Sequence, residues 1–160
     1  MILPRVVLDV NICVRALITR GSAAEIVHNQ ATRYTLYLSQ TLLGKIDEVA
    51  RRPHLFHKYN LHPDEIDAYI RRLQNIGVVI PVTTKLDVLS DPEDNRILAC
   101  AVDARADYLV TGDPHFDSLD GQYGKIRILD SVAFLNIIRL SPNWVFSQFD
   151  VSCSKRIPIV

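Results

Sequence analysis

The sequence predicts one α/β domain in which helices pack on a largely parallel β-sheet. Short apolar runs rich in β-branched and aromatic residues alternate with segments whose apolar residues recur at helical spacing. The length of 160 residues suits one compact domain. A hydrophobic fraction of 48% and a charged fraction of 22% are typical of a globular chain with a substantial core.

One strand and two helices are predicted from residues 6–33. VVLD, at 6–9, is an apolar run that ends in a carboxylate, as expected of a buried strand. A helix follows directly, and Asn11 is positioned to cap it. After a turn at 19–22, Ser22 is expected to cap a second helix over 23–33.

The second strand is predicted at 34–38, YTLYL, from its β-branched and aromatic residues. Ser39 is expected to cap a helix that runs through Ala50, because the apolar residues in this segment follow helical spacing. Pro53 should end this helix. Residues 54–60 are consistent with either a short helix or an irregular connection.

Residues 62–77 predict a further helix, with Pro63 at its start, acidic residues in its first turn and Gly77 after its end. A third strand over 78–83 is limited by Pro81. A loop then leads to the second half of the domain.

The last part of the domain is expected to hold a helix over 93–106, a strand and turn over 107–113, a strand over 125–130 and a helix over 131–140 capped by Ser131. We assign residues 1–138 to the domain. Residues 139–160 break the alternation, and we interpret them as a C-terminal extension: an extra strand, a docked tail or a partner-binding arm.

Charge, hydropathy and cysteine spacing limit the classes of protein and of site that this chain fits. The 18 basic and 18 acidic residues cancel, so the net charge argues neither for nor against nucleic acid. No window is apolar enough to cross a membrane and no signal peptide is evident, which favours a cytoplasmic protein. Cys13, Cys100 and Cys153 are too widely spaced for a zinc site or a disulfide framework, and the first two are expected in the core.

Three aspartates fall where a parallel sheet places its ligands. Asp9 ends the first strand, Asp113 follows a later strand, and Asp94 lies in the first turn of the helix that leads into that strand. Ligands bind outside the carboxyl ends of parallel strands, and a helix that precedes a strand begins at the same edge. Each acid alone is explained by a cap or a turn, whereas their joint placement favours a shared site.

Three carboxylates in one crevice repel each other, and burial increases the repulsion. A divalent cation relieves it. Mg²⁺ or Mn²⁺ would accept these oxygen ligands and keep several waters, and such a site can hydrolyse a phosphodiester. Asp91, in the segment SDP, is interpreted as a turn or cap residue with a supporting role at most.

Three segments resemble the blocks of PIN-domain proteins, in particular the bacterial toxin components of toxin–antitoxin systems. They are VVLDVNICVRALI, LYLSQTLLGKIDEVARRP and DPEDNRILACAVDARADYLVTGDPHF, and the resemblance covers roughly residues 5–138. It implies a three-layer α/β/α domain with a largely parallel sheet. It also implies Mg²⁺- or Mn²⁺-dependent endoribonuclease activity on RNA, an antitoxin protein as partner and a homodimer.

The resemblance also assigns residues. Asp9, Asp94 and Asp113 match the acids that bind metal and carry catalysis in PIN domains. Asn11 matches a polar residue often found two positions after the first acid, and Thr111 matches the hydroxyl residue often found near the metal.

One position departs from the group. The pattern S-x-x-L-L-x-E usually places a glutamate in the helix after the second strand, and here SQTLLGK places Lys45 there. The Lys45 ammonium is positioned either to pair with the aspartates and compete with a cation or to contact an RNA phosphate. Glu48 is a candidate substitute, although it points about 60° further around the helix.

Because Lys45 replaces the glutamate, there is an alternative to the nuclease interpretation. It is a weakened or inactive PIN domain that acts as an RNA- or partner-binding module. A third interpretation is a phosphatase or phosphotransfer receiver with Asp9 as nucleophile. That chemistry requires a second acid beside Asp9, and neither Asn11 nor the preceding VVL provides one.

RNA binding requires basic groups around the crevice. The leading candidates are Arg15, Arg51 and Arg52, and the wider set adds Arg20, His54, His57, Lys58 and His115. Phe56 or Tyr59, among the basic residues of ARRPHLFHKYN, would suit stacking on single-stranded RNA. It is equally consistent with the sequence that Arg51 and Arg52 form a solvated helix end.

Overall fold

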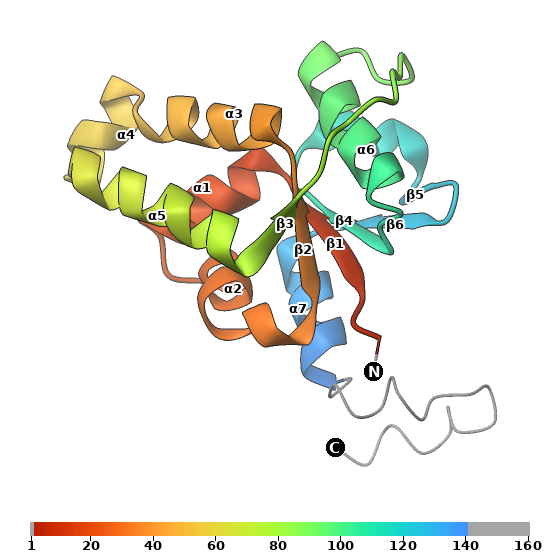
Figure 1. Cartoon of the computed structure of the whole chain (residues 1–160), viewed down its shortest axis with the longest axis horizontal. Coiled ribbons are helices and arrows are strands. Elements are labelled where there is room, and N and C mark those ends of the chain that lie inside the picture. Colours follow the sequence, from red (N-terminus) through yellow and green to blue (C-terminus); the bar gives the residue numbers. More distant parts are fainter. Residues whose placement is uncertain (1, 141–160) are drawn as a thin grey trace.

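The computed structural model describes residues 2–140, and it has one six-stranded sheet with helices on both faces (Figure 1). The strand order is β3-β2-β1-β4-β6-β5, and every neighbouring pair is parallel except β5 with β6. The strands are β1 (Arg5–Leu8), β2 (Thr35–Leu38), β3 (Gly77–Val79), β4 (Tyr108–Val110), β5 (Gln122–Tyr123) and β6 (Ile126–Leu129). The predicted α/β class with a largely parallel sheet is confirmed.

The helices form two layers. Helix α6 lies on one face against β1, β2 and β4, and α1, α3 and α5 gather on the other face, where α1 contacts α3 and α3 contacts α5 (Figure 1). The helical segments are α1 (Val10–Ile18), α2 (Ser22–Ala24), η1 (Glu25–Asn29), η2 (Ala31–Arg33), α3 (Gln40–Ala50), α4 (Pro53–Lys58), α5 (Pro63–Ile76), α6 (Pro92–Asp103), η3 (Pro114–Leu119) and α7 (Ser131–Leu140).

The central strands lie in the core. Val6, Val7 and Leu8 of β1 are fully buried, as are Leu109 and Val110 of β4. This explains why these strands read as continuous apolar runs, since a strand covered on both faces has no solvent-facing side. Cys13 and Cys100 are buried free thiols, as expected from their apolar surroundings, and Cys153 lies outside the described residues.

One expected helix cap, Ser39, is confirmed, and another, Asn11, is replaced by the nearby Asp9. Ser39 caps α3 by accepting a hydrogen bond from the Leu42 N–H at 3.0 Å, as expected. The cap of α1 is Asp9 and not Asn11, because β1 ends at Leu8 and the helix already begins at Val10. The chain therefore turns from strand to helix on a single carboxylate-bearing residue.

Ser22 and Ser131 were expected to be caps, and each is instead the first residue of its helix. Their hydroxyls lie 2.6 Å apart and join the starts of α2 and α7. The cap of α7 is Asp130, whose carboxylate accepts a hydrogen bond from the Ala133 N–H at 2.8 Å.

The helix expected over 23–33 is one α-helical turn, a π-helical turn and a 3-10 turn. The Gln30 N–H bonds to the Glu25 carbonyl at 3.1 Å, five residues back. The side-chain amides of Asn29 and Gln30 both donate to the Glu25 carboxylate, which holds this wide turn in place.

The remaining differences are local. Residues 53–58 form the short helix that was one of two options for this segment, and the expected third strand is shorter and begins at Gly77. The 3-10 helix η3 and the strand β5 were not predicted. Helix α7 runs to Leu140, and the expectations for residues 141–160 lie outside the described residues.

Two glycines provide a paired test of the packing. A Cβ on Gly77 would lie 3.0 Å from the Leu73 carbonyl oxygen and 3.3 Å from that of Leu36, whereas a Cβ on Gly44 meets nothing within 4 Å. We expect Gly77→Ala to lower the free energy of unfolding by roughly 1–3 kcal/mol, because backbone atoms must shift. Gly44→Ala, in the exposed face of α3, should raise it by roughly 0.5–1 kcal/mol through helix propensity. Urea denaturation checks both, and a stabilising Gly77→Ala would contradict the close approach of α5 to β2.

Candidate metal centre

The parallel pairing of β1 with β4 creates the site. Leu8 pairs with Val110, and the Asp9 N–H donates to the Val110 carbonyl at 2.9 Å. Asp9 and Thr111 are the first residues beyond this last pair, so they lie side by side at the carboxyl edge of the sheet.

The Asp9 carboxylate is buried and held at both oxygens. Its side chain accepts from the Val10 N–H at 2.6 Å and from the Thr111 hydroxyl at 2.6 Å, and the residue is only 3% exposed. The same Thr111 hydroxyl oxygen accepts from the Asp113 N–H at 3.1 Å. One threonine thus orients the acids that follow two different strands.

Helix α6 supplies the acids on the other side of the cluster. Asp91 caps the helix by accepting from the Glu93 N–H at 2.8 Å, and Asp94 lies buried in the first turn. Asp91 is the cap residue that the sequence suggested. Its carboxylate also belongs to the cluster, with ligand atoms of Asp91, Asp94 and His115 all within 4.8 Å of one another.

Asn95 holds the loop that leads into α6, a role that sequence reasoning missed. Its buried amide accepts from the N–H groups of Val88 and Leu89, at 3.1 and 2.9 Å. It donates to the carbonyls of Leu89 and Asp91, at 2.8 and 3.2 Å. All these partners precede Asp94, so this one side chain fixes the approach of the chain to the site.

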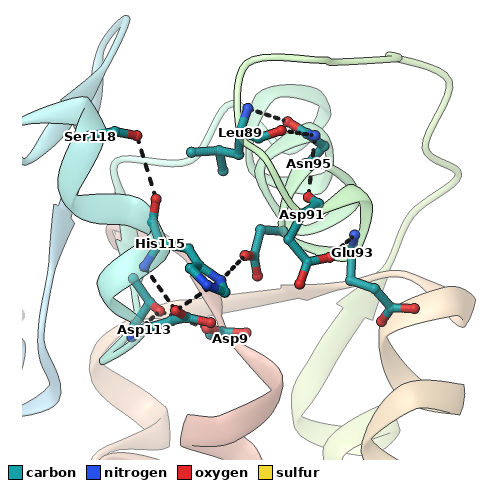
Figure 2. A network of polar contacts seen from close by, with 10 residues as sticks. Asp9, Leu89, Asp91, Glu93, Asn95, Asp113, His115 and Ser118 are labelled. Atoms are coloured by element: carbon teal, nitrogen blue, oxygen red, sulfur yellow. Dashed lines mark hydrogen bonds and ion pairs between the residues drawn. The ribbon is translucent and has the colours of Figure 1, made fainter.

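His115 lies between the acids of the two sides (Figure 2). Its Nδ1 is 3.0 Å from an oxygen of Asp94 and 3.3 Å from an oxygen of Asp113. Sequence reasoning placed His115 only among the basic RNA-binding candidates. The available signal was its position two residues after Asp113 in TGDPH, where the 3-10 turn of η3 brings it back over the strand end.

Negative charge on the buried carboxylates of Asp9 and Asp94 is unfavourable without a positive charge nearby. Burial, more than the nearby charges of Asp94 and Asp113, raises the pKa of Asp9 to about 6, even though the Thr111 and Val10 hydrogen bonds lower it. Burial also raises the pKa of Asp94. The hydrogen bond to Asp94 raises the pKa of His115. Within residues 2–140 no lysine or arginine pairs with Asp9, Asp94 or Asp113.

The donor set fits a divalent cation. Carboxylate oxygens are the ligands that Mg²⁺ and Mn²⁺ prefer, and buried carboxylates with raised pKa values are stabilised by a cation beside them. The imidazole of His115, when protonated, supplies positive charge beside Asp94 and Asp113. Asp9, Asp94, Asp113, Asp91 and Thr111, all proposed from sequence, lie together in this centre. Figure 2 shows Asp9, Asp91 and Asp113 of this set.

Lys45 does not pair with the aspartates. Its ammonium lies 3.3 Å from Glu48 and 3.4 Å from Glu93, which brings α3 and the start of α6 together. The possibility that Lys45 neutralises the aspartate cluster therefore has no support in the geometry. Glu48 is 61% exposed and bound to Lys45, so it does not enter the cluster either.

The three arginines proposed for RNA binding have different surroundings. Arg15 and Arg52 line one groove, together with Asn11. Arg51 points elsewhere, and its guanidinium bonds to Asp47 at 3.0 Å and to Asp67 at 2.5 Å.

Comparison with known proteins gives one family. The family model described as the PIN domain matches residues 5–115, more than half of the chain. No curated protein matches the sequence. No helix in residues 2–140 is long and apolar enough to span a membrane.

The raised pKa of Asp9 makes stability depend on pH. The folded-state value of about 6 lies above the ordinary 3.8, so folding favours the protonated acid. Stability from this group is therefore greatest below about pH 4 and is lost as the pH rises toward 6, by at most about 3 kcal/mol. In chelator, we expect the stability of Asp9→Asn relative to wild type to grow between pH 4 and pH 7.

Thermal denaturation across this range measures the difference between Asp9→Asn and wild type. Asp87→Asn, which removes an exposed loop carboxylate, is the control, and comparison of the two variants isolates the effect of the buried position of Asp9. A pH-independent difference for Asp9→Asn would show that burial does not destabilise the Asp9 anion.

Proposed function

The chain belongs to the PIN-domain family, whose members are generally nucleases, and from this premise we propose that it is a divalent-metal-dependent endoribonuclease. The observation that carries the proposal is the convergence of Asp9, Asp94 and Asp113, from three separate segments, on one edge of the sheet. Such an arrangement costs folding energy unless a cation or a proton compensates it.

Asp9, Asp94 and Asp113 would hold the cation, with Asp91 beside them. When bound, Mg²⁺ or Mn²⁺ supplies the positive charge that polarises a phosphodiester and favours ionisation of water. Thr111 keeps the Asp9 carboxylate oriented and leaves it no freedom to turn toward solvent. Asn95 does the same for the α6 acids through the backbone that precedes them.

His115 would hold a proton between Asp94 and Asp113 in the metal-free protein. A cation that binds these carboxylates competes with this proton, so metal binding is expected to release protons. More than half of the His115 side chain is exposed, at 53%, so the ring has room to move aside.

We also propose that the nuclease is the toxin of a toxin–antitoxin pair and is inhibited by an antitoxin protein. The support for this role is the similarity of its three sequence blocks to that bacterial group. A homodimer is proposed on the same basis.

The first test is cleavage of a labelled single-stranded RNA in Mn²⁺ or Mg²⁺. We expect wild-type protein to cleave, and Asp94→Asn to cleave roughly a hundredfold more slowly or not at all, because a buried metal ligand is lost. Asp87→Asn is the matched control and should keep full activity. Cleavage that persists unchanged in chelator would contradict a metal-dependent reaction.

Lys45 provides the second test. Because its ammonium is held by Glu48 and Glu93, we expect wild-type protein to bind Mn²⁺ in calorimetry and to cleave RNA without any change at position 45. Lys45→Glu should leave the cleavage rate within about threefold of wild type, since the three aspartates are unaltered. If Lys45→Glu alone bound metal and cleaved, the natural chain would be an RNA- or partner-binding module built on a disabled nuclease.

A further inference from the structure

A basic groove with an apolar floor opens beside the metal centre, between α1 and the junction of α3 with α4. Its volume is about 380 Å³. Ile12, Val14 and Val49 are buried and contribute to its floor, and Arg15, Arg52 and His54 are exposed around it. Among residues 2–140, no acidic side chain lines it.

The groove is continuous with the metal centre at two points of the chain. Asn11 lines it and follows Asp9 by two residues, and Gly112 lines it between Thr111 and Asp113. A Cβ built on Gly112 would lie 3.9 Å from Nη1 of Arg15. The Arg15 guanidinium therefore lies over the turn that carries Thr111 and Asp113.

The charge in this groove has little internal compensation. The Arg15 side chain makes no hydrogen bond or ion pair with any residue in 2–140, and Arg52 has one long contact, 3.7 Å to the exposed Glu48. Arg51, the neighbour of Arg52, bonds two aspartates instead. The Arg15 guanidinium and the weakly paired Arg52 guanidinium, both beside a cluster of carboxylates, are available for an anion that is brought to the metal.

We propose that this groove binds the sugar–phosphate backbone of single-stranded RNA next to the bond that is cleaved, with Arg15 and Arg52 on its phosphates. The inference rests on the proposed nuclease function and adds the path of the substrate. A strand whose phosphate lies at Arg15 passes over Gly112 directly onto the carboxylate cluster. The apolar floor accommodates the carbon faces of the riboses.

The groove is expected to read the backbone and not the bases. In the described part of the chain, its lining contains no Phe, Tyr or Trp on which a base would stack. Phe56 and Tyr59, the residues considered for stacking, pack instead against a small cluster of Ala50, Leu61 and Ile66. Affinity at this site should therefore come from phosphate contacts, which are insensitive to sequence and sensitive to salt.

A single strand suits this surface better than a duplex. The cationic groups surround a concavity, and a flexible strand can enter it and bend onto the adjacent turn. A duplex is a stiff cylinder whose phosphates remain on its outside, so it would touch the rim without reaching the floor.

The test is fluorescence anisotropy of labelled 12-nucleotide oligo(U) and oligo(A) in chelator, where cleavage does not proceed. We expect Arg15→Gln and Arg52→Gln each to weaken binding roughly five- to tenfold at 50 mM salt. Each should also lower the slope of log affinity against log salt by about 0.7, the value for one phosphate contact on a single strand. Oligo(U) and oligo(A) should respond alike, and a 12-base-pair RNA duplex should bind more weakly than either.

Arg51→Gln is the matched control. It removes the same charge from the residue next to Arg52, and the Arg51 side chain bonds to Asp47 and Asp67 outside the groove. It should bind RNA like wild type, and thermal denaturation verifies that every variant is folded. Equal losses for Arg51→Gln and Arg52→Gln, or wild-type binding by Arg15→Gln, would overturn the proposed groove, as would the absence of RNA binding by wild type.

Metal-dependent cleavage distinguishes failure of the groove from failure of the nuclease. If Arg15→Gln weakens RNA binding but wild-type protein never cleaves RNA, the groove is supported and the nuclease function is contradicted. If wild-type protein cleaves RNA but Arg15→Gln binds RNA as tightly as wild type does, the nuclease function is supported and the groove is contradicted.

Discussion

The parallel pairing of β1 with β4 is the constraint on which the site depends. Pairing of Leu8 with Val110 leaves Asp9 and Thr111 as adjacent residues beyond the last hydrogen-bonded position, where the Thr111 hydroxyl reaches the Asp9 carboxylate. A shift of one residue would turn these side chains toward opposite faces of the sheet. The bonds from the Asp9 N–H to the Val110 carbonyl, at 2.9 Å, and from the Thr111 hydroxyl to the Asp9 carboxylate, at 2.6 Å, are made in this register.

The protein holds negative charge where it is unfavourable and uses neutral groups to do so. Thr111, the Val10 N–H and the amide of Asn95 orient the acids or the backbone around them, and none of these groups carries charge. A lysine or arginine in their place would neutralise the acids permanently and occupy the position of a cation. The arrangement instead leaves the charge available, and the titratable His115 lies between Asp94 and Asp113. Lys45 does not neutralise the aspartates, because its ammonium pairs with Glu48 and Glu93.

Helix α1 links the two halves of the proposed function. Its cap, Asp9, is a metal-binding candidate, and six residues later Arg15 on the same helix lies over the turn that carries Asp113. The proposed substrate anchor and the proposed metal ligand thus lie on one helix that begins directly at the end of a buried strand. A short connection of this kind limits relative motion between the guanidinium and the carboxylates, which favours a defined path for the substrate.

The sequence by itself determined the alternation of strands and helices, the parallel sheet and the edge at which Asp9, Asp94 and Asp113 meet, because periodicity and strand ends are local properties. It also indicated Asp91 as a cap and Thr111 as a neighbour of the acids. Only the tertiary structure decided which partner each side chain takes. Lys45 pairs with Glu93 across two helices, His115 folds back between two acids, and neighbouring Arg51 and Arg52 face different surroundings. These choices depend on distances between segments far apart in the chain, and spacing along a sequence does not contain them.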